Sequence, residues 1–508
     1  MCILFEFVMS KTNPARGMRD FLPADVRKRE YVIGIIKEVY ESYGFEPLET
    51  PAVENLETLM GKYGEEGNQL IFKILKRGEK LDQSLDSLGG LGSKEPSGSE
   101  GTLTSKTFET SKTSQTDLSD LALRYDLTVP LARVVAHHRN DLPKFFKRYQ
   151  IQPVWRADRP ARGRFREFYQ CDVDAIGSTS VVVEAEVIAA ATEILARLGF
   201  RDVAVLLNHR DVLFGILEAS SVPPEKHTDA LTALDKLDKI GPAGVAEELI
   251  ARGVFKFDEA SAFVELVRSK VQFQAFPVRD VPTNEKELRQ ENYENNLFHL
   301  GEFEKVLEQS EAGQHGIQEL RKLFELIGSE SSARVSFHPS LARGLSYYTG
   351  TIIEFGLDNN DFSGSIGGGG RYDGLIGMFG KEQIPACGFS LGLERILVVM
   401  EERGMFPTEI ADSTPADLMV TIWSEETIAE SLKLAADLRS AGLRVTVYPE
   451  PDKFGKQMKY ADQINVPYVA VLGETEIVEG KVTLKNMKTG EQETIDRDQL
   501  VQAVSHKL

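Results

Sequence analysis

One stretch of the sequence, residues 144–177, constrains the fold of this chain more than any other. Its two flanks have the pattern of strands, and its Pro/Gly/Arg-rich centre has the pattern of a connection, which predicts an antiparallel hairpin with a long loop. In the return strand four polar residues share one parity and face the same way: Arg166, Gln170, Asp172 and Asp174. Such a face suits a zwitterionic ligand beside a phosphate, since arginines bind planar oxyanions with paired donors. A solvated hairpin held by salt bridges explains the spacing equally well.

Two other segments place polar groups where a ligand can reach them. Asp126 and Thr128 stand two residues apart at an expected strand end, so both can accept from one ammonium group, or they cap a helix. The segment Arg343-Gly-Leu-Ser-Tyr-Tyr348 offers one cation and two phenols, or else forms a strand with packed aromatic rings.

Glycines mark two more segments. The four residues Gly367–Gly370 allow backbone to approach a ligand closely, or simply form a bulged turn. The segment Cys387–Ile396 reads as a strand that runs into an apolar helix. Its glycines leave room for a flat ring against the strand, and Arg395 can then reach a phosphate.

Length and composition set limits on the kind of protein. A chain of 508 residues exceeds a single core, which predicts two to four domains. Three widely separated cysteines favour a reducing cytoplasm, and no apolar run approaches the roughly 18 residues that span a bilayer. The net charge of −19 argues against a non-specific nucleic-acid binder. The sequence has neither the glycine-rich phosphate-binding loop of nucleotide hydrolases nor the dinucleotide-binding fingerprint.

Shifts in pattern along the chain predict its domains. Strand and helix patterns at 121–210 and 331–405, a mostly helical pattern at 211–330 and a β–α alternation from residue 416 predict an α+β part with a helical segment, followed by a C-terminal α/β domain with a mainly parallel sheet. The Ser/Gly/Lys-rich residues at about 80–119 are expected to form a flexible surface insert. The expected boundaries are 1–12 for a disordered N-terminal extension, 13–210 and 331–405 for the two parts of the first domain, 211–330 for the helical insertion, 406–415 for a linker and 416–508 for the last domain.

Together these segments resemble the three signature motifs of class II aminoacyl-tRNA synthetases, and specifically the histidyl-tRNA synthetase family of the eukaryote-like branch. Residues 24–51, an amphipathic helix followed by a proline-limited strand, resemble motif 1. Residues 144–177 resemble motif 2 and residues 384–399 motif 3, while the Arg343–Tyr348 and Gly-Gly-Arg-Tyr-Asp-Gly runs resemble the histidine-specific elements. The resemblance covers about residues 13–78 and 120–508. It implies an α+β catalytic domain on an antiparallel sheet, formed by residues 13–210 and 331–405, with a helical insertion and a C-terminal α/β anticodon-binding domain.

The resemblance implies a role for each matching residue. Histidine binding is implied for Asp126, Leu127, Thr128, Gln170, Asp174, Arg343, Tyr347, Tyr348 and Tyr372. Within that set, Asp126, Thr128 and Gln170 would hold the α-ammonium group, and Asp174 and Tyr348 would read the imidazole. ATP binding is implied for Arg156, Asp158, Arg164 and Arg395, with Arg156 and Arg343 as the catalytic residues at the α-phosphate. The implied partners are ATP as a substrate, Mg²⁺ held mainly through the ATP phosphates, L-histidine, tRNA(His) and a second copy of the chain, with no protein side chains identified as metal ligands.

The resemblance leaves one difference and one alternative function. Ser346 stands where the family usually has Asp, next to the implied site residues. The alternative is that the chain is a synthetase-like regulatory subunit, which binds histidine or a partner enzyme without charging tRNA. Another class IIa specificity is disfavoured by Arg343-Gly-Leu-Ser-Tyr-Tyr348. In the last domain Lys453, Lys456 and Lys459 are spaced to share a helix face, which suits contact with tRNA or simply solvent.

Overall fold

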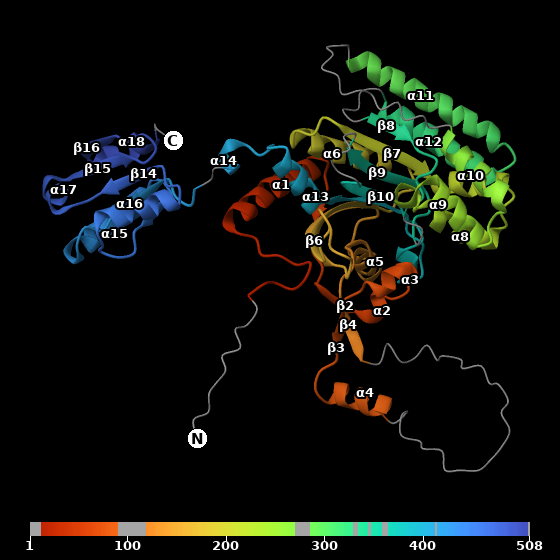
Figure 1. The fold of residues 1–508 in the computed structure, drawn as a ribbon, viewed down its shortest axis with the longest axis horizontal. Coiled ribbons are helices and arrows are strands. Elements are labelled where there is room, and N and C mark those ends of the chain that lie inside the picture. Colours follow the sequence, from red (N-terminus) through yellow and green to blue (C-terminus); the bar gives the residue numbers. More distant parts are fainter. Residues whose placement is uncertain are drawn as a thin grey trace. The chain divides into compact units, whose positions relative to one another are not determined.

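A computed structural model divides the chain into two compact units, Met1–Met405 and Phe406–Leu508 (Figure 1). It describes residues 12–89, 118–269, 285–328, 334–343, 347–357, 364–411 and 414–505. Several predictions fall wholly or partly outside these residues, among them most of the N-terminal extension 1–12, the centre of the insert at 80–119, Ser346, two residues of the linker at 406–415 and residues 270–284 of the helical insertion.

The first unit is built on a sheet whose strand order is β1-β5-β6-β11-β10-β9-β7-β8. In that order the strands are Glu46–Pro47, Phe146–Trp155, Glu167–Ile176, Ala386–Gly392, Gly367–Arg371, Thr351–Leu357, Val203–His209 and Arg334–Phe337. The six central strands pair antiparallel, whereas β1 and β8 run parallel to their neighbours at the two edges. The predicted antiparallel catalytic sheet is therefore confirmed, and its four glycines form strand β10 rather than a turn.

The predicted hairpin is strands β5 and β6, which pair from Phe146 opposite Ile176 to Trp155 opposite Glu167. On the far side β6 pairs with β11, which leads directly into helix α13 (Leu393–Glu402) as predicted. Because β6 is the middle strand of this group, its side chains on one face are enclosed by those of both neighbours.

Helices cover the sheet. The predicted amphipathic helix is α1 (Pro23–Ser42), whose Val32, Ile36 and Val39 are fully buried. Helix α1 packs against α6 (Val182–Arg197) and α13, and these two contact strands β6 and β11 (Figure 1). The two-residue strand β1 follows α1 at the sheet edge, where its proline leaves no donor unpaired.

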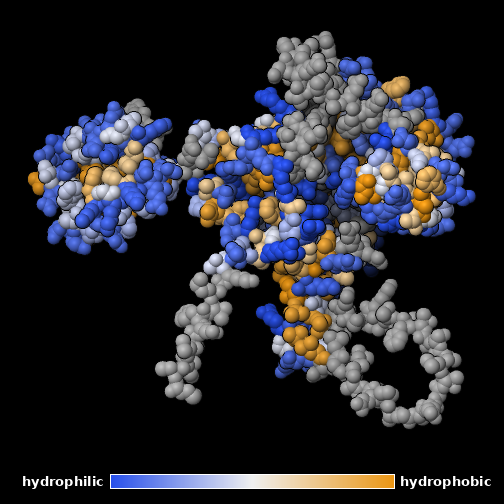
Figure 2. Space-filling model, viewed as in Figure 1, coloured by the Kyte–Doolittle hydropathy of each residue, from blue (hydrophilic) through white to orange (hydrophobic). Residues whose placement is uncertain are grey.

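A small sheet of order β2-β4-β3 lies beside the main one, with strands Val53–Asn55, Ser119–Leu123 and Lys73–Leu75. Around it are helices α2 (Leu56–Leu59), α3 (Gly64–Gln69), α4 (Glu79–Gly89) and α5 (Thr128–His137). The first ten residues of the insert expected from about residue 80 lie in helix α4, whose apolar face the Ser/Gly-rich composition obscured. Figure 2 shows apolar residues gathered over this small sheet, and Val53 and Leu75 are among the exposed ones.

The described part of residues 211–330 is mainly helical, as the sequence predicts. Its elements are α7 (Arg210–Ala219), η1 (Pro224–Lys226), α8 (His227–Leu234), α9 (Leu237–Ala251), α10 (Phe257–Ser269), α11 (Glu285–Val306) and α12 (Glu311–Ile327). Gly241, with a φ of 70°, and Pro242 kink α9. Helix α12 packs against α7 and α6, which joins this helical region to the sheet. The short helix η2 (Ile376–Met378) precedes strand β11.

The second unit has a sheet of order β13-β12-β14-β15-β16. Its elements are α14 (Thr408–Ala411), β12 (Leu418–Val420), η3 (Glu425–Thr427), α15 (Ile428–Ser440), β13 (Val445–Val447), α16 (Phe454–Gln463), β14 (Tyr468–Val471), α17 (Glu474–Glu479), β15 (Lys481–Asn486), β16 (Gln492–Asp496), η4 (Arg497–Gln499) and α18 (Leu500–Ser505). The predicted β–α alternation is present, but the sheet is not mainly parallel. Strands β12, β13 and β14 are parallel, whereas β15 and β16 form an antiparallel hairpin whose polar residues concealed it in the sequence.

Among the helices that the structure describes, none combines the length and the hydropathy that crossing a bilayer requires.

Candidate active site

The candidate site is built on strand β6. Three alternating residues of this strand face one side of the sheet: Gln170, Asp172 and Asp174. Strand β11 places Gly388 opposite Asp174 and Ser390 opposite Asp172. A Cβ on Gly388 would lie 1.8 Å from Asp174 Oδ1, so only glycine leaves room for that carboxylate. This glycine therefore makes space for an acidic side chain of the site itself.

Arg148, on strand β5, is the buried cation of this face. It lies directly across from Asp174 and is 0% exposed. Its Nη2 is 2.7 Å from Asp174 Oδ2 and 3.9 Å from Asp172 Oδ2, and its Nη1 donates to Gln150 Oε1 at 3.2 Å. The pKa values of both aspartates are raised by burial, that of Asp172 to about 7, and Arg148 opposes both shifts.

Asp126 joins this acidic group from the start of helix α5. Its Oδ1 accepts from the Val129 N–H at 3.0 Å and from the Tyr63 hydroxyl at 2.9 Å, so it caps the helix as the structural interpretation of the motif proposes. Burial raises the pKa of Asp126, although the Val129 N–H lowers it. Beside it, the Leu127 carbonyl accepts from Arg148 at 3.5 Å, and the half-buried Thr128 begins the helix.

Three tyrosines lie together at the acidic end of the site. The Tyr347 ring centroid lies 4.9 Å from that of Tyr348 and 6.4 Å from that of Tyr372, with edge-to-face geometry in both pairs. The Tyr372 hydroxyl donates to Asp174 Oδ1. Burial raises the pKa of each of the three phenols, so all three are hydrogen-bond donors at neutral pH.

A second group of charges is mainly basic. Arg343 forms an ion pair with Glu354 of strand β9, and its Nη1 donates to Ser365 Oγ at 2.8 Å. Arg395 donates to the backbone carbonyl of Ser365, so one residue orients both guanidinium groups. Burial raises the pKa of Glu354 to about 7, and both arginines oppose that shift. The pKa of Arg395 is lowered by burial and by Arg164 and Arg343 nearby.

Arg156 lies between the two groups of charges. Its Nε donates to the Tyr125 carbonyl at 3.0 Å, and its guanidinium stacks 4.3 Å from the Tyr125 ring centroid and 5.2 Å from that of Phe168. It acts electrostatically on Asp126 at one end and on Arg395 at the other. Within the loop of the hairpin, Arg164 Nε is 3.5 Å from Asp158 Oδ2, so the two residues expected to contact different parts of ATP contact each other.

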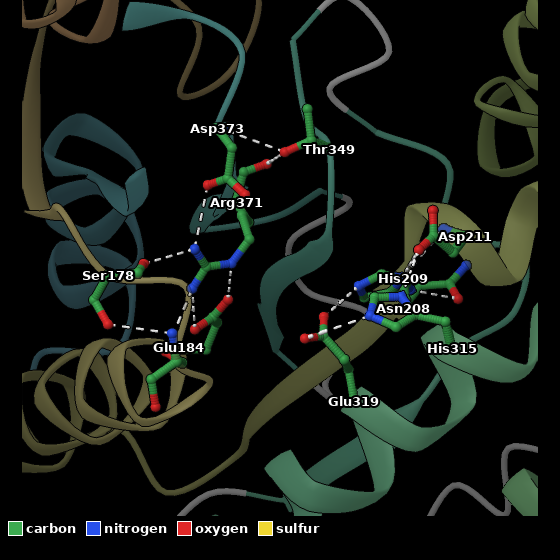
Figure 3. Close-up of polar contacts among 11 residues, drawn as sticks. Ser178, Glu184, Asn208, His209, Asp211, His315, Glu319, Thr349, Arg371 and Asp373 are labelled. Atoms are coloured by element: carbon green, nitrogen blue, oxygen red, sulfur yellow. Dashed lines mark hydrogen bonds and ion pairs between the residues drawn. The ribbon is translucent and has the colours of Figure 1, made fainter. Parts of the chain in front are cut away.

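Arg371, at the end of strand β10, anchors the segment that carries Tyr372 (Figure 3). Its Nε and Nη2 donate to the two carboxylate oxygens of Glu184 on helix α6 at 2.7 and 2.8 Å. Its Nη1 donates to the Ser178 carbonyl at 2.9 Å. Because Glu184 is completely buried, this bidentate pair fixes the strand end and thereby holds Tyr372 against Asp174.

A separate polar cluster joins helices α7 and α12 (Figure 3). His209 Nδ1 accepts from the Asp211 N–H at 3.1 Å, so its Nε2 carries the proton and donates to Glu319 at 3.0 Å. His315 Nδ1 lies 2.8 Å from an Asp211 oxygen. These contacts cap α7 and hold α12 in place, which makes them structural.

The structure brings the predicted residues of the first unit into two adjoining groups. The three predicted lysines belong to the second unit, where Lys453 is the N-cap of α16 and Lys456 Nζ is 2.8 Å from an Asp452 oxygen. Among the described residues no group of three or more His, Cys, Asp or Glu side chains is arranged to hold a metal ion.

Sequence reasoning missed Arg148 and Glu354. Arg148 lies in a run of cations that resembles a solvated surface, but its parity with Gln150 on the same strand was a usable signal. Glu354 is the lone carboxylate in the apolar strand Thr351–Leu357, which is itself a signal of a buried partner.

Comparison with known proteins agrees with this architecture. The family model for histidyl-tRNA synthetase matches residues 17–87 and 97–396, and the model for the anticodon binding domain matches residues 417–507. The histidine–tRNA ligase of Porphyromonas gingivalis is 43% identical over 96% of this chain and 98% of its own length. That of Christiangramia forsetii is 41% identical over 96% and 97%, respectively.

Solved structures agree as well. The crystal structure of histidyl-tRNA synthetase from Nostoc sp. PCC 7120 has a TM-score of 0.71 and 29% identity, covering 98% of this chain and 99% of that one. A Bacillus halodurans structure described as an ATP phosphoribosyltransferase regulatory subunit/histidyl-tRNA synthetase has a TM-score of 0.65 and 21% identity, covering 93% and 99%, which shows a shared fold alone. The two family models and the full-length relatives establish that this chain belongs to the histidyl-tRNA synthetase family.

Proposed function

We propose that this chain is a histidine–tRNA ligase, which activates L-histidine with ATP to histidyl-adenylate and pyrophosphate and then transfers histidine to the 3′ end of tRNA(His). The observation that carries the proposal is one site with two oppositely charged ends. Buried aspartates form one end and arginines the other, and Arg156 lies between them. This polarity suits a substrate pair made of a cationic amino acid and a polyphosphate.

The acidic end holds histidine. Asp126, Thr128 and Gln170 bind its α-ammonium group, since carboxylate, hydroxyl and amide oxygens all accept from an ammonium. Asp174 and Tyr348 form the end of the pocket that receives the imidazole. Tyr347 and Tyr372 enclose the ring, and a buried acceptor beside it penalises amino acids that lack a ring N–H.

The basic end holds ATP and promotes the first step. The histidine carboxylate attacks the α-phosphorus, pyrophosphate leaves, and no enzyme nucleophile is needed. Arg156 and Arg343 neutralise charge at the α-phosphate, and Arg395 neutralises charge at the γ-phosphate. Asp158 contacts adenine and Arg164 the pyrophosphate side, once the pair that they form with each other opens. Mg²⁺, held mainly through the phosphate oxygens, would neutralise further charge there. Glu354, a carboxylate of this basic end, is already paired with Arg343.

Residues 13–210 and 331–405 form the catalytic domain, and the remaining parts of the chain bind tRNA. Residues 211–330 cover the acceptor stem, and residues 416–508 bind the anticodon. In the second unit, Lys453, Lys456 and Lys459 are exposed and are close in sequence to the aromatic residues of α16. Single-stranded bases stack on aromatic rings, and nearby cations contact their phosphates.

The chain acts as a homodimer in the cytoplasm. Support for a dimer comes from a groove beside the edge strand β1, which is lined by apolar residues such as Leu48, Pro51 and Val53 together with Glu49, Glu54 and Arg133. Apolar residues with charged neighbours next to a short, proline-limited strand suit contact with a second copy.

The decisive experiment is ATP–pyrophosphate exchange with each of the twenty amino acids in the absence of tRNA. Exchange with histidine alone, followed by charging of a tRNA(His) transcript, is the expected result. Histidine binding without exchange would instead favour a regulatory subunit that binds histidine or a partner enzyme. Exchange with a different amino acid would overturn the specificity.

A further inference from the structure

Asp172 is a buried carboxylate of the pocket for which the proposed reaction has no role so far. It is 2% exposed and lies between Gln150 of β5 and Ser390 of β11. Its Oδ2 is 3.9 Å from Arg148, and its Oδ1 is buried with no hydrogen-bond partner among the described residues. A buried carboxylate oxygen without a donor is unfavourable, so this atom calls for a donor from a ligand.

Three other carboxylate oxygens of the acidic end already have a protein partner. Asp174 Oδ1 accepts from the Tyr372 hydroxyl, and its Oδ2 forms the ion pair with Arg148 at 2.7 Å. Asp126 Oδ1 accepts two hydrogen bonds. Asp172 Oδ1 has neither a hydrogen bond nor an ion pair among the described residues, so it is an acceptor available to a substrate nitrogen.

The position of Asp172 along β6 indicates which nitrogen it meets. Gln170 precedes it on the same face and carries a second buried acceptor without a partner, Oε1, near the ammonium end of the pocket. Asp172 is the next residue on that face, about 7 Å further along the strand and toward Asp174. Asp174, the following residue on that face, accepts from the Tyr372 hydroxyl, so Asp172 lies between Gln170 and the aromatic end.

We infer that Asp172 is a further specificity-determining residue, which accepts a hydrogen bond at Oδ1 from the ring N–H of bound histidine. Arg148 is the positioning residue, since it holds Asp172 and Asp174 side by side without touching the substrate. The inference rests on the proposed function and adds to it a second acidic residue that recognises the imidazole. Asp174, which already contacts Arg148 and Tyr372, then lies beside the ring.

The test measures ATP–pyrophosphate exchange by Asp172→Ala and Asp172→Asn with two substrates, histidine and β-thienylalanine, whose ring has no N–H. We expect Asp172→Ala to raise the KM for histidine about 10- to 100-fold, as for loss of a hydrogen bond to a charged group, with the KM for ATP unchanged. The preference for histidine over β-thienylalanine should fall by at least about 10-fold. Asp172→Asn, which keeps an acceptor without the charge, should show a smaller loss.

Asp202→Asn is the matched control, because Asp202 also pairs with an arginine, Arg403, but lies outside the pocket. It should leave both preference and KM unchanged. A raised KM with intact preference would overturn the inference, since Asp172 would then meet the ammonium. An unchanged KM in a folded Asp172→Ala variant would overturn it as well. Wild-type protein that shows no histidine-dependent exchange would instead overturn the proposed function, a distinct result.

Discussion

The two ends of the candidate site are opposites in charge and share one design. At the acidic end, three buried aspartates surround a single guanidinium, that of Arg148. At the basic end, arginines surround a single buried carboxylate, that of Glu354. In each case one group of opposite sign holds like charges together and leaves an excess for the ligand to neutralise. A site can thus be prepared for a charged ligand before the ligand arrives.

The two ends differ in burial. The three aspartates around Arg148 are 2–3% exposed, whereas the side chain of Arg343, which pairs with Glu354, is 42% exposed. Charges interact more strongly where water is excluded, so the central group of the acidic end should matter more to folding. The basic end can exchange its internal contacts for water or phosphate at lower cost.

The strongest way to break this comparison is Arg148→Met. Removing the cation leaves buried carboxylates unpaired, which should lower the free energy of unfolding by about 3–5 kcal/mol, measured by urea denaturation. Glu354→Gln in the same assay should cost much less, because the arginines left behind are partly solvated. Adding Asp174→Asn to Arg148→Met should recover part of the loss. Equal losses of unfolding free energy for Arg148→Met and Glu354→Gln would mean that the two ends contribute equally to folding.

The next effect in size concerns Arg156, which joins the ends. Arg156→Ala should lower kcat for histidine-dependent exchange by about 10²–10³-fold, since it removes the preorganised cation that we propose acts at the reacting phosphorus. Arg162→Ala is the matched control, because Arg162 lies in the same hairpin loop and pairs with the exposed Glu402 outside the site. That control should stay within about 2-fold of wild type. Full activity of Arg156→Ala would mean that Arg156 does not contribute to the chemical step.

A pH titration sharpens the comparison at the basic end. Burial raises the pKa of Glu354 to about 7, above its ordinary value of 4.5. The folded state therefore binds this proton more tightly than the unfolded state. Its contribution to stability is present below pH 4.5 and is lost as the pH rises through about 7, by at most about 3 kcal/mol.

Glu354→Gln cannot titrate, so the stability of wild type relative to this variant should fall between pH 5 and pH 8. Urea denaturation of both proteins at several pH values measures this difference. The control is Glu41→Gln, an exposed carboxyl that binds the Tyr149 hydroxyl away from the pocket. Parallel curves for wild type and Glu354→Gln would mean that this carboxyl stays charged throughout.

Much of this arrangement was predictable from local pattern. The hairpin, helix α1 and the passage from β11 into α13 follow from strand alternation and helical periodicity. Arg148 and Glu354 were missed because a central strand buries both faces, so a charge there looks like surface until its partners on neighbouring strands are known. The contact between Asp158 and Arg164 depends on the path of a loop, which spacing alone does not define. Helix α4 was missed because composition was averaged over a window that also held the Ser/Gly-rich residues.

The smallest effect is expected at the exposed lysines of the second unit, where charge lies in water rather than in a pocket. Changing Lys453, Lys456 and Lys459 together to Ala should weaken tRNA binding about 10-fold at low salt and reduce the slope of log affinity against log salt by about 2. Lys456→Ala alone should do least, because that lysine already pairs with Asp452. Lys433→Ala, on the exposed face of α15, is the control. Since salt screens exposed charges and scarcely affects buried ones, the triple variant should leave histidine-dependent exchange unchanged at every salt concentration. A loss of exchange would show that the exposed and buried charges are not independent.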